Sequence, residues 1–109
     1  NKSQRFSRAL IDVTVANDAD LTKVEEVVGS VGSELVEDEI WGSRLLGAPT
    51  LLGVQALDGL GTTVRLVVDT EPASQWAVER ELRSRLRGRL LEAGIVLPHS
   101  TGAPIRPVQ

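Results

Sequence analysis

The feature that most constrains this chain is the stretch 72–98, which has the pattern of one long helix followed by a stop signal. Apolar residues recur along it every three to four positions, which places them on one helical face. They are Val78, Leu82, Leu86, Leu90 and Ala93. Pro72 fits the first turn of a helix, and Gly94 fits the left-handed position that ends one. A helix with one long apolar face needs a second layer to cover that face, so we expect the rest of the chain to supply a sheet.

The segments before this helix supply such a layer. Residues 8–15 alternate between apolar and polar positions, as a half-buried strand does. Asp20 then offers an oxygen that can cap a helix, and an apolar stripe follows at helical spacing. This stripe consists of Leu21, Val24, Val28, Val31 and Leu35. We therefore expect a strand followed by a helix, with residues 37–49 as an irregular connection.

A β-hairpin is expected next. Residues 50–57 form the first strand, with a bulge or close approach at Gly53, and residues 62–70 form the second. A four-residue loop at 58–61 joins them, and residues 95–97 add a short last strand after the long helix. The order βαββαβ predicts an α+β, ferredoxin-like fold with an antiparallel or mixed sheet and two helices on one face. We assign residues 1–7 to a linker or the end of a preceding β domain, 8–98 to the domain and 99–109 to a tail.

One face of such a sheet stays free of helices. Strand alternation places Leu10 and Val67 on that face, and we also expect Leu51 there. An apolar strip on an exposed sheet can mark a partner surface, although scattered surface hydrophobes are an equally good explanation.

Composition narrows the functions open to the chain. There is no Cys, so a disulfide framework and thiolate metal ligands are excluded. The sequence contains no run of about 18 apolar residues, so it predicts no membrane-spanning helix. The net charge of −3, with a pI near 5.1, argues against general nucleic-acid binding, which depends on a surplus of Lys and Arg. Because the chain begins at Asn1 and contains no Met, we expect it to be part of a longer protein.

No catalytic, metal or cofactor site emerges from the sequence. His99 is the only histidine and has no carboxylate within five residues on either side. The turn at 59–61 lacks the third glycine of a dinucleotide-binding loop and opens a strand, not a helix. The acidic run 37–39 resembles ordinary solvated runs more than a cation site. We expect no enzymatic activity and no cofactor.

Arginines form a second stripe on the long helix. Five of them lie between residues 80 and 89. At 100° per residue, a flank well away from the apolar face contains Trp76, Arg80, Arg83, Arg87 and Leu91. Trp and Arg are enriched at the energetic centres of protein interfaces, so this flank is the candidate subunit interface. An ordinary solvated helix face is the competing interpretation.

Several segments in order along the chain resemble the carboxyl-terminal cytoplasmic α/β domain of small-conductance mechanosensitive (MscS-type) channels. The pattern Gly94-Ile95-x-x-Pro98 is the last of these landmarks. The others lie at 7–16, 18–24, 64–68 and 72–82, and Asn1 and Ser3 are similar to the Asn-x-Ser that ends the preceding β domain of the family. After Pro98, the aromatic, Pro and Gln that the family commonly carries are replaced by His99, Ser100 and Thr101.

The resemblance implies a role that the residue patterns alone do not. The parent protein would be an inner or plasma membrane channel that opens under bilayer tension and releases solutes during hypo-osmotic shock. This domain would belong to its cytoplasmic cage, where seven subunits assemble and lateral openings lie between neighbours. Its partners would be other copies of the subunit and the transmembrane and β domains of the parent chain.

Two other functions share the predicted architecture. A regulatory module of ferredoxin-like fold would bind a small ligand, such as an amino acid, at a dimer interface. An acylphosphatase-like enzyme would need an arginine in a phosphate-binding loop and an asparagine facing it, but no Asn follows Asn17.

Overall fold

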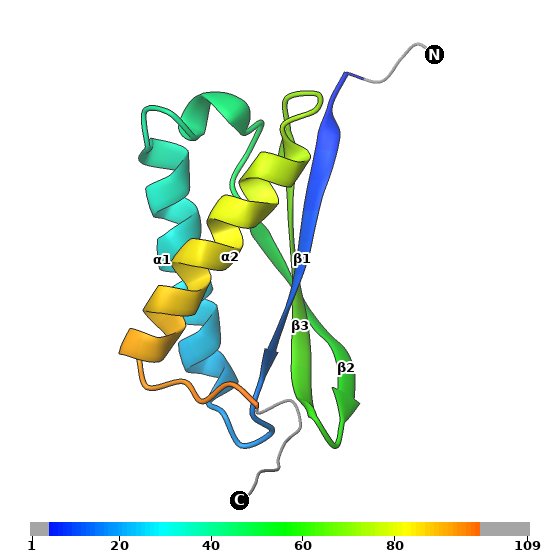
Figure 1. Ribbon diagram of the computed structural model, residues 1–109, viewed down its shortest axis with the longest axis vertical. Helices are drawn as coiled ribbons and strands as arrows, with labels where there is room; N and C mark the ends of the chain where they lie inside the picture. Colours follow the sequence, from blue (N-terminus) through cyan, green and yellow to red (C-terminus); the bar gives the residue numbers. More distant parts are fainter. Residues whose placement is uncertain (1–4, 99–109) are drawn as a thin grey trace, which may run out of the picture.

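Three strands form an antiparallel sheet, and both helices cover the same face of it (Figure 1). The computed structural model describes residues 5–98. In chain order the elements are β1 (Ser7–Val15), α1 (Leu21–Glu37), a short 3-10 helix η1 (Gly42–Arg44), β2 (Thr50–Asp58), β3 (Gly61–Thr70) and α2 (Gln75–Glu92). The strand order is β1-β3-β2, so β1 and β2 are the two edges. This arrangement confirms the predicted α+β, ferredoxin-like fold class.

The core lies between the helices and the sheet and is almost entirely aliphatic. The two stripes predicted from helical spacing converge there, because Val24, Val28, Val31 and Leu35 of α1 and Val78, Leu82, Leu86 and Leu90 of α2 are all buried. From the sheet, Ala9, Ile11, Val15, Val64, Leu66 and Val68 complete the core. β1 and β3 thus contribute alternate residues to the core face, as the period of two requires.

The two ends of α1 are capped by acidic residues. The Asp20 carboxylate accepts hydrogen bonds from the backbone N–H of Thr22 and Lys23, at 3.0 and 3.4 Å. At the other end Asp38 follows the last turn, and its N–H donates to Leu35 C=O. Both aspartates satisfy backbone groups that a helix end leaves without partners.

The start of α2 differs from the expectation. The helix begins at Gln75, and Pro72 lies before it as the second residue of a tight turn that the Ser74 N–H closes on Glu71 C=O at 3.0 Å. Ala73, the third residue of this turn, has a φ of 68°, a left-handed conformation that a Pro-containing turn of this type imposes. Proline therefore sets the turn and not the first helical turn.

Gly94 ends α2 as expected, with a φ of 79°. The Gly94 N–H donates to Leu91 C=O and the Ile95 N–H donates to Leu90 C=O, both at 3.0 Å. This pair of bonds defines a Schellman motif, and the buried side chains of Ile95 and Leu90 supply its usual apolar contact. The sequence signal for the helix end thus has a full structural explanation.

The short strand expected at 95–97 does not form within the described part of the chain. Residues 95–98 leave α2 without regular secondary structure, and one backbone hydrogen bond joins them to the end of β1, from Ala16 N–H to Val96 C=O at 2.9 Å. A single bond does not make a ladder, which explains why the prediction of a strand was wrong for these three residues.

The hairpin is tighter than predicted. Asp58 pairs with Gly61, so only Gly59 and Leu60 lie at the tip, and the Asp58 carboxylate accepts the N–H groups of Leu60 and Gly61 at 2.8 and 3.3 Å. The predicted irregularity at Gly53 is confirmed, because the register between β2 and β3 shifts there and its φ is 102°. Bulges such as this one hinder the addition of a further strand at the β2 edge.

Candidate functional site

The arginines of α2 fall on two sides of the helix, and the two sides have different surroundings. We call Glu81, Arg85 and Arg89, which face α1, the paired flank. The open flank consists of the five residues predicted as a subunit interface, namely Trp76, Arg80, Arg83, Arg87 and Leu91. The buried stripe of α2 lies between them. One helix therefore presents guanidinium groups to a neighbouring helix on one side and to solvent on the other.

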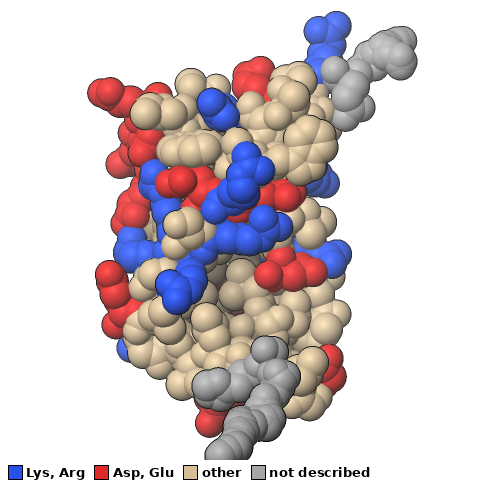
Figure 2. Space-filling view, in the orientation of Figure 1, with Lys and Arg blue, Asp and Glu red and all other residues tan. Residues whose placement is uncertain are grey.

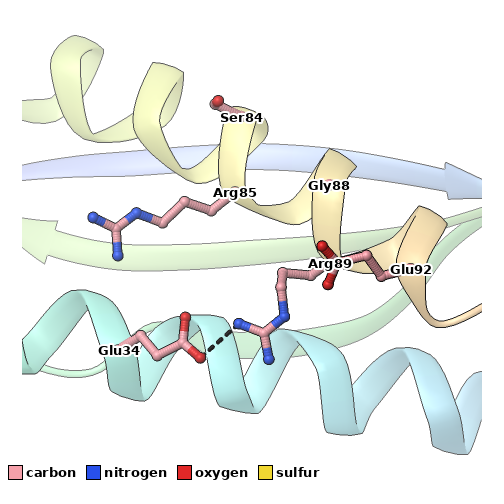
Figure 3. A pocket seen from close by; sticks show the side chains of 6 residues that line it. All are labelled: Glu34, Ser84, Arg85, Gly88, Arg89 and Glu92. Atoms are coloured by element: carbon pink, nitrogen blue, oxygen red, sulfur yellow. Dashed lines mark hydrogen bonds and ion pairs between the residues drawn. The ribbon is translucent and has the colours of Figure 1, made fainter.

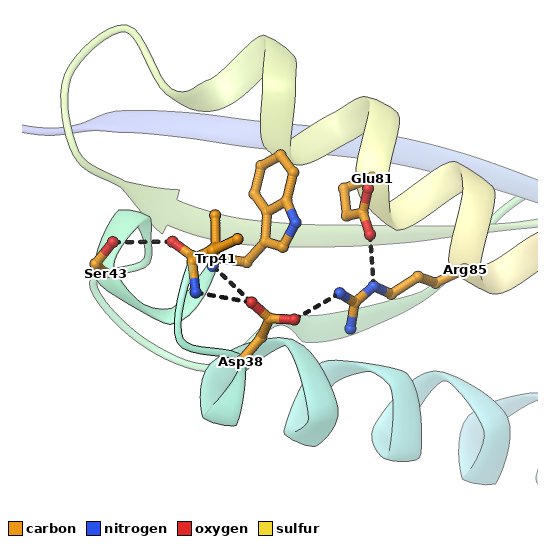
Figure 4. Close-up of polar contacts among 6 residues, drawn as sticks. Asp38, Trp41, Ser43, Glu81 and Arg85 are labelled. Carbon is orange, nitrogen blue, oxygen red and sulfur yellow. Dashed lines mark hydrogen bonds and ion pairs between the residues drawn. The ribbon is translucent and has the colours of Figure 1, made fainter.

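The centre of the paired flank is Arg85. Its Nε donates to Glu81, one helical turn earlier, at 2.7 Å, and its Nη2 donates to Asp38 at the end of α1, at 3.0 Å (Figure 4). The Asp38 carboxylate also accepts the backbone N–H groups of Trp41 and Ile40, at 3.0 and 2.8 Å. The Trp41 N–H, then Arg85, then the Ile40 N–H lower the pKa of Asp38 below its ordinary value. Asp38 thus fixes the α1–η1 connection to α2.

A second ion pair extends the paired flank toward the end of α2. Arg89 donates to Glu34 of α1, and the two side chains point toward each other across the gap between the helices (Figure 3). Ser84, Gly88 and Glu92 line the rest of this shallow, open depression of about 330 Å³. Because both of its arginines, Arg85 and Arg89, already pair with carboxylates, the depression is best explained as a contact between helices and not as a ligand site.

Within residues 5–98, no second element packs against the open flank. Trp76 is 60% exposed and Leu91 is 49% exposed. Arg83 makes a long contact of 3.7 Å with Glu79, and Arg80 and Arg87 form no ion pair with any of residues 5–98. Figure 2 shows Lys and Arg side chains gathered over α2 in the middle of the view, with Asp and Glu along the margin where α1 lies. The structure thus brings the five predicted residues together on one exposed surface.

A groove lies between α2 and β1, beside the open flank, and we call it the edge groove. Its volume is about 270 Å³. Apolar side chains form most of its lining, and Arg83, Arg87 and Asp12 lie among the residues around it. The apolar lining residues are Val13, Leu86, Leu90 and Leu97. It is a surface groove with an apolar base and charged borders.

Glu79 protects part of the neighbouring strand edge. Its carboxylate accepts the backbone N–H of Leu10 at 3.0 Å, although Leu10 lies on β1 and Glu79 on α2. No local sequence pattern predicts this contact, since the two residues are 69 positions apart. Carboxylates placed against a free strand edge reduce its tendency to pair with other chains.

The helix-free face of the sheet is more polar than expected. Leu10 and Val67 do lie opposite each other there. Flanking rows hold ion pairs, from Arg8 to Asp69 at 2.9 Å and from Arg65 to Asp12 at 2.8 Å, and a Thr14–Thr63 hydrogen bond at 2.8 Å. The Arg65 hydrogen bond lowers the pKa of Asp12. This face therefore carries one apolar pair within a polar ladder.

The prediction for Leu51 was wrong. Leu51 pairs with Leu66, whose side chain is buried in the core, and Leu51 is partly buried against that same core. The misassignment arose because the β2 bulges break simple alternation, so counting by twos along residues 50–57 does not give the correct face.

Within residues 5–98 no group of three His, Asp or Glu side chains is placed to hold a metal ion. In that same part of the chain, neither helix has the length and apolar character needed to cross a bilayer. His99 lies outside the described residues. Pro98 lies within them, and its ring is close to Gly61, since a Cβ built on that glycine would be 3.3 Å from Pro98 Cγ.

Sequence comparison identifies the family to which this α+β domain belongs. Residues 9–97 match the family model described as "Mechanosensitive ion channel MscS, C-terminal". The chain therefore belongs to this family. The match spans both helices and all three strands, so it includes the whole of the candidate site.

Two relatives carry channel names. The chain is 27% identical over 101 residues to the "Small-conductance mechanosensitive channel" of Caldanaerobacter subterraneus subsp. tengcongensis, covering 91% of this chain and 34% of the relative. It is 30% identical over 90 residues to the "Moderate conductance mechanosensitive channel YbiO" of Escherichia coli, covering 83% of this chain and 12% of the relative. The chain thus spans about a third or less of each relative. Both relatives are named as channels and neither as an enzyme, which favours the channel interpretation over the regulatory-module and acylphosphatase-like alternatives.

Proposed function

We propose that this chain is a cytoplasmic cage domain of a mechanosensitive channel, contributing to subunit assembly and to filtering of solutes near the pore, without covalent chemistry. Membership of the family supports the channel part of this proposal. The proposed location is the cytoplasmic side of an inner or plasma membrane. The proposed partners are other copies of the subunit, seven in all as the family resemblance implies, and the transmembrane and β domains of the parent chain.

The observation that carries the assembly role is the composition and exposure of the open flank. Trp76 and Leu91 expose large apolar surface at its two ends, and three arginines lie between them. Arg80 and Arg87 have no ion-pair partner among the described residues, so their guanidinium groups are available to a neighbour. A planar guanidinium can bind a carboxylate with two parallel hydrogen bonds, which gives orientation as well as affinity.

Charge reversal in the full-length parent protein tests this role. Arg83→Glu together with Arg87→Glu should lower the oligomer mass measured by analytical ultracentrifugation, because four units of charge change on a surface that contacts a neighbour. A charge-matched control, Arg5→Glu with Lys23→Glu, changes two exposed cations away from the open flank. We expect the control to keep the native mass.

Folding is checked on the same samples by circular dichroism and thermal melting. If the flank variant keeps both its fold and the native oligomer mass, the assembly role of the open flank is wrong. If the control loses mass to the same extent, general electrostatics governs assembly and the flank has no special part in it.

A further inference from the structure

A second depression lies between α1 and β2, and we call it the α1–β2 hollow. Its volume is about 310 Å³, and Glu25 and Gly29 of α1 line one side of it. The strand order makes β1 and β2 the two opposite edges of the sheet, and the edge groove beside the open flank is lined by β1. The hollow and the open flank are therefore on opposite sides of the domain. The other residues that line the hollow are Val28, Pro49, Leu51, Leu52 and Gly53.

Gly29 leaves space in this hollow that the domain itself does not fill. A Cβ built on Gly29 would have no neighbour within 4 Å, whereas a Cβ on Gly32 would be 3.3 Å from the Pro49 ring. Glycine within a helix weakens it, and packing within residues 5–98 gives no steric reason for a glycine at position 29. Close approach of a group from outside the domain is such a reason. Leu52, which also lines the hollow, is 52% exposed.

Unpaired carboxylates lie beside the hollow. Glu25 and the next residue, Glu26, are both exposed, and neither forms an ion pair with any of residues 5–98. On the other side of the domain, Arg80 and Arg87 are unpaired cations in the same sense. Figure 2 shows this separation, with Asp and Glu along the margin where α1 lies and Lys and Arg over α2. The two sides of one domain thus have complementary charge.

These two surfaces can meet only between copies of the chain. Within one copy they face away from each other, because the paired flank of α2, and not the open flank, contacts α1. Two open flanks placed against each other would bring arginines against arginines, which is unfavourable. A contact between different surfaces of identical chains is heterologous, and such contacts form a ring when the rotation between copies closes.

We propose that the open flank of one copy binds the α1–β2 hollow of a second copy, an inference that rests on the assembly role proposed above. Trp76 of one copy enters the hollow at Gly29 of the next, and Arg80 and Arg83 bind Glu25 and Glu26. The spacing fits, because Arg80 is four residues from Trp76 and Glu25 is four residues from Gly29, which is ~6 Å along each helix axis. Trp and Arg in a pocket of the partner are typical of interface centres.

A charge exchange in the full-length parent protein tests the pairing. Arg80→Glu with Arg83→Glu, and separately Glu25→Arg with Glu26→Arg, should each lower the oligomer mass measured by analytical ultracentrifugation. All four changes in one chain should restore the native mass, because opposite charges again meet at every contact. The charge-matched control for the second pair is Glu39→Arg with Glu92→Arg, two exposed carboxylates outside both surfaces, which should keep the native mass.

The outcomes separate this inference from the proposed function. If the arginine pair lowers the mass but the glutamate pair does not, or if the fourfold variant is not restored, the open flank acts in assembly but its partner is not the α1–β2 hollow. If the arginine pair keeps the native mass as well, the assembly role of the open flank is wrong. Circular dichroism of each variant checks the fold.

Filling the hollow tests the position of Trp76 without a change of charge. Gly29→Gln and Trp76→Ala should each raise the concentration at which half of the parent protein is assembled by at least about tenfold. The two changes together should have hardly more effect than the stronger one alone, because both remove the same contact. Glutamine favours a helix more than glycine does, so Gly29→Gln should not unfold α1.

Gly88→Gln is the matched control, because Gly88 is an exposed glycine of α2 with no neighbour within 4 Å of a built Cβ and lies outside the open flank. We expect this control to change the half-assembly concentration by about twofold or less. Independent effects of Gly29→Gln and Trp76→Ala, seen as fold-changes that multiply in the double variant, would contradict the docking of Trp76 at Gly29. Equal effects of Gly29→Gln and Gly88→Gln would contradict it as well.

Discussion

The paired and open flanks of α2 both contain arginines only a few positions apart, yet these arginines have different surroundings in the domain. Arg85 bonds to two carboxylates and is about a quarter exposed, and Arg89 reaches Glu34. Arg83 is 57% exposed, and within residues 5–98 its one ion-pair contact is with Glu79, at 3.7 Å. The difference is the presence of α1 on one side of α2 and its absence on the other.

An arginine run in a helix is therefore not one functional feature. The arginines that face α1 hold two elements of the same domain together, whereas the others remain free to contact a different molecule. Exposed ion pairs contribute little to stability, because solvent screens them and ordering long side chains costs entropy. Substitutions on the paired flank should therefore lower the free energy of unfolding more than substitutions on the exposed open flank do.

The largest effect is expected at the buried stripe between the flanks. Leu86→Ala should reduce the free energy of unfolding by about 2–5 kcal/mol, because Leu86 is 2% exposed and its removal leaves a cavity. Urea unfolding of the 109-residue chain measures this change. Leu91→Ala, on the open flank, is the matched control and should change stability by about 0.5 kcal/mol or less. Equal losses would mean that the open flank is part of the core.

The next effect concerns the centre of the paired flank. Arg85→Ala should cost about 1–2 kcal/mol of unfolding free energy, since it leaves Asp38 and Glu81 without their shared cation. Arg83→Ala, which removes the same side chain from the other side of the helix, should cost about 0.5 kcal/mol or less. If urea unfolding gives the two variants the same stability, the paired flank does not stabilise the domain more than the open flank does.

A smaller effect should appear as a pH dependence of stability. The folded-state pKa of Asp38 lies below its unfolded value of about 3.9, so the unfolded state binds a proton first as the pH falls. The stabilisation is complete above about pH 5 and is lost as the pH falls through the folded pKa. Asp38→Asn keeps an oxygen acceptor but cannot titrate, so thermal melts from pH 6 to pH 2 should show a shallower decline. An unchanged slope would mean that the titration of Asp38 does not contribute to the pH dependence of stability.

The smallest effect is expected on the open flank itself. The double variant Arg80→Ala with Arg87→Ala should keep the unfolding free energy within about 0.5 kcal/mol of the parent chain, since neither side chain has an ion-pair partner in residues 5–98. Its counterpart, Arg85→Ala with Arg89→Ala, should be clearly less stable in the same urea titration. A loss above about 1 kcal/mol in the first double variant would show that the open flank stabilises the isolated domain.

Local patterns predicted most of the fold because each reports one element and one face. The spacing of Val24, Val28 and Val31 gave the buried side of α1, and the spacing of Leu82, Leu86 and Leu90 gave that of α2. Errors arose where a local rule had two outcomes. Proline suits a turn as well as a first helical turn, so Pro72 misplaced the start of α2, and bulges in β2 put Leu51 on the wrong face.

Only part of the candidate site could be predicted from the sequence. Its five residues could be found because helical geometry groups them without reference to any other element. The i, i+4 pair of Glu81 and Arg85 was also readable from spacing. No spacing rule connects Arg85 to Asp38, 47 positions away, or Glu79 to Leu10. Those contacts exist only because the sheet and α1 bring distant segments to the same helix.

By itself, the sequence of this protein determined the helix faces, the alternating strands, the glycine that ends α2 and the family to which the chain belongs. These follow from dihedral preferences and the period of each element, which act over a few residues. Only the tertiary structure decided which arginines became ties to α1 and which stayed exposed, and which amide of β1 is bound by Glu79. The reason is physical: the partner of a charged side chain or of a strand edge is set by packing between elements, to which residues far apart in the chain contribute.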